Sequence, residues 1–356
     1  MSGLKLGSYI FNLLTRINGT IGTRGTIGTR GTIGTRGFRL PCPVCPRCPV
    51  CPSVAFRHYP SGETYNLRIF MKISEILQQD KVTISFEVFP PKKADGFATI
   101  SAATEAIAQL KPDFMSVTYG AGGGTSEFTV DIADNLQRNY GITMLPHLTC
   151  VSSTREHVAT MVRKFQERGL ENIMALRGDI PDGGSPSQDY HYAYELIQDI
   201  KRQGDFCLGG ACYPEGHPDT PHKVDDIAHL KDKVDAGLSF LTTQMFFDNN
   251  IFYNFLYRIR ERGITVPVLA GIMPITNAKQ VERAIHLSAS NVPQRFRAMV
   301  DHFGDRPGAM KQAGIVYASD QIIDLVANGV KHIHVYTMNK PEIAAGILSN
   351  LSDIWK

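Results

Sequence analysis

The chain has 356 residues, of which 43% are hydrophobic and 20% charged, enough for one large core or two ordinary domains. No apolar run reaches the roughly 18 residues that a membrane span needs, so we expect no membrane partner. The charge is uneven: residues 1–70 hold nine Lys/Arg and one acidic residue, whereas residues 71–356 hold 28 Lys/Arg and 33 Asp/Glu, a net charge of −5. This mildly acidic body excludes an electrostatic footprint for nucleic acid.

Residues 1–70 differ from the rest of the chain in composition. The hexapeptide GTIGTR occurs three times in succession over residues 19–36, and four of the seven cysteines lie in PCPVCPRCPVCP, residues 41–52. The two C-x-x-C pairs are separated by two residues, whereas a zinc ribbon needs roughly 15–20 residues between its pairs. We therefore interpret residues 1–70 as a low-complexity extension, disordered or a non-native start, with Met71 as the natural beginning of the body. The basic, acid-poor composition also leaves a mitochondrial-type presequence open.

The other three cysteines, Cys150, Cys207 and Cys212, are scattered through the body. Such isolated thiols are typical of a reducing, cytoplasmic setting rather than of a disulfide framework.

From residue 83 the sequence alternates between apolar runs and segments of helical periodicity. Strands are predicted at 83–89, 114–120, 143–150, 172–179, 206–214, 240–248, 266–274 and 332–338. Helices are predicted at 102–111, 126–140, 154–169, 189–203, 223–236, 249–262, 277–289, 307–328 and 340–351. Nearly continuous apolar strands separated by helices indicate a parallel sheet. Eight such units over residues 71–356 predict a single closed (β/α)8 TIM barrel. An open doubly wound sheet is disfavoured because no Gly-rich dinucleotide motif follows the first strand.

Polar side chains collect at the carboxyl ends of seven of these strands, the end at which barrel enzymes carry their active sites. They are Glu87, Thr118, Tyr119, His147, Thr149, Arg177, Asp179, Tyr213, Glu215, His217, Gln244, Asp248, Tyr336 and Asn339. Glu87 is a single acid at the end of the apolar stretch KVTISFEVFPPK. Neither an H-E-x-x-H helix nor a G-x-S-x-G elbow occurs, so metal-ligand and nucleophile motifs are missing.

Nine segments in order along the chain resemble the methylenetetrahydrofolate reductase family. They are FEVFPPK, SVTYGAGG, PHLTC, ALRGDIP, YPEGHP, KVDAG, TQMFFD, GIMPI and VYTMNK, and the likeness covers residues 71–356. The resemblance implies an FAD-dependent barrel of the compact bacterial type. Reduced nicotinamide (NADH or NADPH) would pass a hydride to FAD and leave. 5,10-Methylenetetrahydrofolate would then accept the hydride at the same place and become 5-methyltetrahydrofolate, which feeds methionine synthesis.

The resemblance also assigns roles to residues. Glu87 matches the general acid, and we expect burial at the strand end to raise its pKa toward the working pH. Asp179 matches a catalytic acid near the flavin that would stabilise a cationic intermediate. FAD contacts are implied for Thr118, Tyr119, Ala121, His147, Arg177, Gly178, Asp179, Tyr192, Tyr213, His217, Asp226 and Lys233. Substrate contacts are implied for Glu87, Thr118, Gln244, Gln280 and Lys340.

Some positions depart from the family pattern: Val88, His229, Asp232, Ala284 and Lys340. Asp232 stands in place of a basic residue near the FAD phosphates, and Lys340 in place of Arg loses forked hydrogen bonding. Two other interpretations stay open: a metal-dependent barrel hydrolase or lyase that uses His147, His217 and Glu87, and a non-catalytic flavin- or folate-binding barrel. For the reductase we expect no metal, small-molecule partners only, and a homo-oligomer.

Overall fold

The computed structural model describes residues 70–91, 93–119, 126–179, 186–217, 223–281, 284 and 291–355. Eight parallel strands close into one barrel in the order of the sequence, which confirms the predicted TIM barrel. The strands are β1 (Thr83–Val88), β2 (Phe114–Val117), β3 (Met144–Thr149), β4 (Asn172–Leu176), β5 (Cys207–Cys212), β6 (Phe240–Thr243), β7 (Val268–Ile272) and β8 (His332–Tyr336). The low-complexity extension, including its cysteines, lies outside the described residues.

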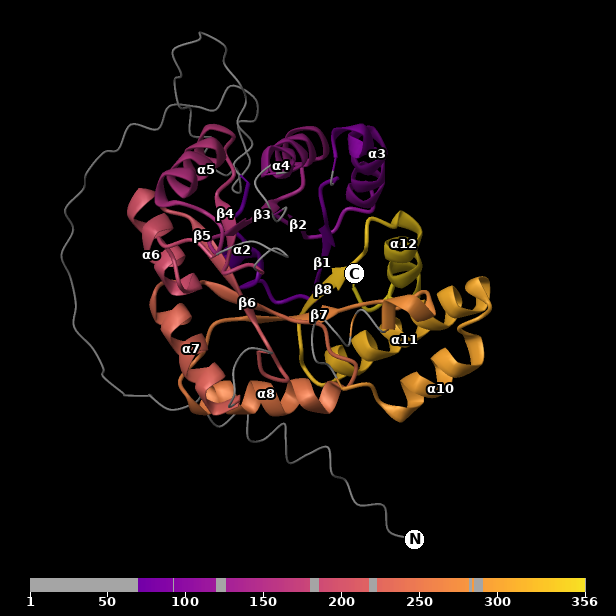
Figure 1. The fold of residues 1–356 in the computed structure, drawn as a ribbon. Helices are drawn as coiled ribbons and strands as arrows, with labels where there is room; N and C mark the ends of the chain where they lie inside the picture. Colours follow the sequence, from indigo (N-terminus) through magenta and orange to yellow (C-terminus); the bar gives the residue numbers. More distant parts are fainter. Residues whose placement is uncertain are drawn as a thin grey trace, which may run out of the picture. The chain divides into compact units, whose positions relative to one another are not determined.

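The described helices surround the strands, except the first, which closes one end of the barrel (Figure 1). They are α2 (Ile73–Ile76), α3 (Phe97–Ala108), α4 (Ser126–Tyr140), α5 (Arg155–Glu167), α6 (Ala193–Gln203), α7 (Lys223–Asp235), α8 (Asn249–Glu261), α10 (Gln294–Phe303), α11 (Pro307–Ala327) and α12 (Pro341–Asn350), with a short 3-10 turn η1 (Ala94–Gly96). Within the described part of the chain, no helix is both long and apolar enough to cross a bilayer.

The structure corrects several predicted boundaries. The first barrel helix, α3, begins at Phe97 rather than at residue 102, and α10 was not expected. Most strands end earlier than predicted; β4 stops at Leu176 and β6 at Thr243. The polar residues that follow these strands belong to loops, because they face the mouth of the barrel instead of extending the sheet. Of the helix predicted at 277–289, residue 277 is a bend, residues 278–281 and 284 are helical, and the others lie outside the described residues.

The two faces of β1 explain the alternation in its sequence. Ile84, Phe86 and Val88 belong to the large core between the strands and the surrounding helices. Ser85 and Glu87 face the barrel interior, because strand side chains alternate with a period of two. Glu87 therefore does not interrupt an apolar face, but ends a polar one.

An apolar layer closes the barrel at the amino-terminal ends of the strands. Six strands each contribute one residue to it, and α2 with the following turn adds three: Phe114, Leu145, Met174, Cys207, Phe240, Leu269, Ile73, Ile76 and Leu77. The backbone amide of Ile73 donates to the side-chain oxygen of Asn172 at 2.8 Å, which fixes α2 to the barrel. Among the described residues this apolar layer fills the amino-terminal end of the barrel, so we look for a ligand site at the opposite mouth.

Candidate active site

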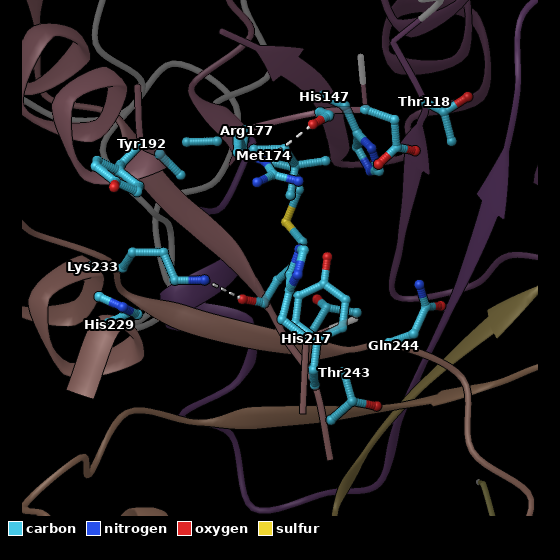
Figure 2. Close-up of a pocket in the computed structure, with 18 of the residues that line it drawn as sticks. Thr118, His147, Met174, Arg177, Tyr192, His217, His229, Lys233, Thr243 and Gln244 are labelled. Carbon is cyan, nitrogen blue, oxygen red and sulfur yellow. Dashed lines mark hydrogen bonds between the residues drawn. The ribbon is translucent and has the colours of Figure 1, made fainter. Parts of the chain in front are cut away.

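A cavity of about 800 Å³ opens at the carboxyl ends of the strands. Twelve of the residues predicted to bind cofactor or substrate line it (Figure 2): Glu87, Thr118, His147, Arg177, Gly178, Asp179, Tyr192, Tyr213, His217, Asp226, Lys233 and Gln244. They come from β1 and β3, from the loops after β2, β4, β5 and β6, and from α7 and the residue before α6. The fold thus brings together side chains that are up to 157 residues apart in the sequence.

Glu87 lies in the inner wall of this cavity, and its side chain is 20% exposed. In the strand register it stands beside Ser116 on β2 and Tyr336 on β8. The Ser116 hydroxyl donates to Oε2 of Glu87 at 3.4 Å, while Nε2 of His147 and Nε2 of His334 each lie 3.6 Å from the same oxygen. One carboxylate oxygen is therefore surrounded by three polar side chains.

This surrounding reverses the expected pKa shift of Glu87. Loss of water is the largest single effect and raises the pKa of the carboxyl group, as anticipated from its position. The hydrogen bond and charge of His334, the charge of His147 and the hydrogen bond of Ser116 together outweigh it, so the pKa of Glu87 lies below its usual value. The expectation of a raised pKa was wrong, and Glu87 is ionised near neutral pH.

His147 behaves differently because it is more deeply enclosed. Burial lowers the pKa of its imidazole to about 4, against a smaller opposing effect of the Glu87 carboxylate. His147 is therefore neutral near pH 7, and it offers the cavity a polar ring without a charge.

Cationic groups lie in another part of the cavity wall (Figure 2). The ammonium group of Lys233 donates to the backbone oxygen of Ala211 at 2.7 Å. Burial disfavours charge, so it lowers the pKa of Lys233 and raises the pKa of nearby Asp226. Arg177 lines the same cavity. Next to it, Gly178 has a left-handed φ of 82°, and a Cβ there would lie 2.9 Å from Cβ of Thr149. Only glycine allows this close approach of the loop to β3.

Aromatic rings line a further part of the wall. Tyr213 and His217 meet edge to face with ring centroids 4.5 Å apart. Tyr192, which is 57% exposed, stacks at 6.4 Å on His229, one of the positions that depart from the family pattern. His229 and Asp232 both line the cavity. Flat rings beside cationic groups suit a ligand that combines an aromatic system with phosphates.

Four other predicted residues are not among the described lining residues. Tyr119 pairs through its hydroxyl with Nε2 of His157 at 2.7 Å. The side-chain oxygen of Gln280 accepts from the backbone amide of Thr276 at 2.8 Å, and the ammonium of Lys340 donates to the hydroxyl of Thr276 at 3.3 Å. Ala121 lies outside the described residues. Substrate contacts by Gln280 and Lys340 stay predictions.

Sequence reasoning missed several lining residues, of which His334, Met174, Thr242, Thr243 and Tyr194 are examples. His334 is 2% exposed and lies in the middle of β8, so it does not stand at the strand end where polar residues were sought. A signal did exist, because His332, His334 and Tyr336 alternate along β8 and therefore share one face.

The metal-dependent alternative lacks a ligand set in the described residues, where no three His, Cys, Asp or Glu side chains are grouped so that they could hold a metal ion. His147, His217 and Glu87 line one cavity, but they do not form such a group.

The fold and cavity define a TIM-barrel protein with a large polar ligand site at the carboxyl ends of its strands. The family model described as "Methylenetetrahydrofolate reductase" matches residues 72–352. The 5,10-methylenetetrahydrofolate reductase of Pectobacterium carotovorum subsp. carotovorum is 36% identical over 274 residues, which cover 77% of this chain and 91% of that protein. That of Escherichia coli (strain K12) is 35% identical, with 77% and 92% covered.

A plant relative, methylenetetrahydrofolate reductase (NADH) 1 of Arabidopsis thaliana, is 34% identical over 80% of this chain, and the match spans 51% of its length. Among solved structures, an uncharacterized protein from Clostridium thermocellum that binds two copies of 5-methyl-5,6,7,8-tetrahydrofolic acid superposes with a TM-score of 0.57. It is 16% identical, with 79% of this chain and 98% of that chain covered, so the likeness concerns the fold alone. The chain belongs to the methylenetetrahydrofolate reductase family.

Proposed function

We propose that this protein reduces 5,10-methylenetetrahydrofolate to 5-methyltetrahydrofolate, with FAD as the bound cofactor and NADH or NADPH as the electron donor. The observation that supports this best is Glu87, a carboxyl group in the inner wall of a ligand-sized cavity in a chain of this family. A reaction that opens the imidazolidine ring of a folate needs an acid at a nitrogen, and an acid within a cavity can reach it.

The cavity has the features that a flavin dinucleotide requires. Its volume of about 800 Å³ lies in the range of sites for large ligands. Lys233 and Arg177 supply positive charge for a diphosphate, Gly178 permits close backbone approach, and Tyr213 with His217 offers ring faces. Bound FAD would supply hydride transfer between the nicotinamide and the folate.

The protein's own side chains would orient the folate and manage its proton. Glu87 donates a proton to the nitrogen whose bond opens. Asp179, at the mouth above β4, places negative charge where a cationic folate intermediate needs it. The side-chain oxygen of Gln244 accepts from the backbone amide of Met245 at 2.9 Å, and we assign its NH2 group to an acceptor on the substrate.

The test begins with purified protein, which we expect to be yellow with a flavin absorption band; a colourless, zinc-rich preparation would favour the metal-dependent alternative. Anaerobic stopped-flow then follows flavin bleaching by NADH or NADPH and its recolouring by methylenetetrahydrofolate. Glu87→Gln should retain flavin and its bleaching, but lose recolouring by about 10²–10⁴-fold. Glu167→Gln, at an exposed position of α5, is the matched control. Equal recolouring in Glu87→Gln and wild type would refute the acid role, and no recolouring in either would favour a non-catalytic binding barrel.

A further inference from the structure

Below the mouth of the cavity, a row of polar side chains crosses three neighbouring strands. Ser85 stands beside His334 in the register of β1 and β8, and Glu87 stands beside Ser116 in the register of β1 and β2. Ser85 and Ser116 are fully buried and His334 is 2% exposed. Buried polar groups destabilise a protein unless their hydrogen bonds are satisfied. The need for a partner at each of these side chains therefore restricts the positions of their hydrogens.

Ser85 contacts Nδ1 of His334 and so bears on the tautomer of its ring. The hydroxyl of Ser85 donates to the backbone oxygen of Ile333 at 3.1 Å. The same hydroxyl oxygen lies 2.8 Å from Nδ1 of His334. A hydroxyl has one hydrogen, and when that of Ser85 goes to the Ile333 carbonyl, Nδ1 of a neutral His334 carries a hydrogen and donates it to Ser85. A neutral His334 therefore has its lone pair on Nε2.

That lone pair is directed toward Glu87. Nε2 lies 3.6 Å from Oε2 of Glu87 and 3.4 Å from the hydroxyl oxygen of Ser116, which itself donates to Oε2 at 3.4 Å. If Glu87 is ionised and Nε2 of His334 carries no hydrogen, the carboxylate and the Nε2 lone pair are both acceptors. The Ser116 hydroxyl hydrogen is then the only one between them, and the two acceptors repel each other. One additional proton removes this repulsion, either on Nε2, which then donates to Ser116, or on Oε2 of Glu87.

We propose that Glu87 and His334 hold one proton in common, and that His334 is the positioning residue that supplies Glu87 with the proton for the substrate. The transfer of the proton to a folate rests on the proposed function, whereas the sharing of the proton between Glu87 and His334 does not. The proton passes between Nε2 of His334 and Oε2 of Glu87 over the Ser116 hydroxyl, which lies 3.4 Å from each of the two atoms.

Filling the cavity drives the proton toward Glu87. When ligands exclude water, a buried ion pair becomes less favourable than the corresponding neutral pair. The Nε2–H bond of His334 then breaks and an O–H bond forms at Glu87, through the Ser116 hydroxyl, with no change in total charge. Glu87 gives this proton to the folate nitrogen, and water later returns one proton to the pair.

Two other titratable groups face the pair and leave its proton in place. His147 of β3 lies 3.6 Å from Oε2 of Glu87, and the ring of Tyr336 on β8 lies edge-on to that of His334 at 5.4 Å. Burial lowers the pKa of His147 to about 4 and raises that of Tyr336 well above its usual value, so both are neutral near pH 7. The ring of Phe114 stacks on His334 at 6.4 Å and adds no charge.

The shared proton can be tested without flavin or folate. Histidine NMR of the full-length protein follows the titration of His334, assigned with His334→Asn. In Glu87→Gln we expect its midpoint to fall by about one pH unit or more, because the carboxylate that favours the imidazolium is gone. In Ser85→Ala the hydrogen of the neutral His334 ring should no longer be held on Nδ1, and the nitrogen chemical shifts of the ring report this change directly. An unchanged midpoint in Glu87→Gln, or an Nε2–H tautomer of neutral His334 in wild type, would overturn the proposal.

Kinetics test the supply of the proton. His334→Asn keeps an N–H donor for Ser85 but removes the titrating Nε2. His332→Asn, two residues earlier on the same face of β8 and hydrogen-bonded to Thr83 at 3.0 Å, is the matched control. We expect His334→Asn to slow flavin recolouring by methylenetetrahydrofolate at least ~10-fold and to change its pH profile, with bleaching by NADH unaffected. The same rates and pH profile in His334→Asn and wild type would refute the role of His334. Failure of wild type to recolour would instead refute the proposed function, and the NMR titration would still decide on the shared proton.

Discussion

The buried imidazole of His147 should make the protein less stable in mild acid. Its side chain is 9% exposed, and burial lowers its pKa from 6.5 to about 4. Between these two values the unfolded chain binds more protons than the folded protein does. The contribution to stability is therefore complete above about pH 6.5 and is lost as the pH falls toward 4. Between about pH 7.5 and about pH 4.5, this one group should remove about 2.5 kcal/mol from the free energy of unfolding.

Urea denaturation at these two pH values measures the loss. His147→Gln cannot titrate, so its free energy of unfolding should fall about 2.5 kcal/mol less than that of wild type over the same interval. His302→Gln, at an exposed position on α10, should fall as much as wild type. The comparison concerns the difference between two pH values, so a constant cost of the substitution cancels. Equal losses in His147→Gln and wild type would refute the assignment of a neutral, buried His147.

Three other outcomes can be checked. Gly178→Ala combines left-handed backbone strain with a steric clash and should destabilise the protein by about 2–4 kcal/mol. The control Gly263→Ala has a φ of 73° and no atom within 4 Å of the added Cβ, so it should cost only about 1–2 kcal/mol. Equal melting temperatures of the two variants would contradict the clash. Burial raises the pKa of the Cys150 thiol to about 12 and that of Cys212 further, so neither should react with iodoacetamide at about pH 8 in the folded protein; rapid labelling seen by mass spectrometry would contradict this. A chain that begins at Met71 should keep the melting temperature and flavin content of the full chain, and a marked drop in either would show that residues 1–70 contribute.

The sequence was sufficient for the barrel because its signals are local. Strand and helix periodicities lie in contiguous segments, and eight repeats of one unit leave few alternatives to closure. The helix α10 was not predicted although Phe296, Met299, Val300 and Phe303 have helical spacing and pack in one cluster, because one helix, α11, already completes the unit between β7 and β8. Strand ends were placed too late where polar residues such as Arg177 leave the sheet to line the cavity.

The sequence also determined most of the candidate site, since the carboxyl ends of parallel strands meet at one mouth whatever their separation along the chain. Only the tertiary structure decided the state of Glu87. Its burial was readable from the surrounding apolar strand, but His334 and His147 reach its carboxylate from strands that are distant in sequence. An apolar segment predicts that a residue within it will be buried, whereas its charge and hydrogen-bond partners depend on which strands the closed barrel sets side by side. The sign of the pKa shift, and the proton that we infer Glu87 and His334 to share, follow from that register.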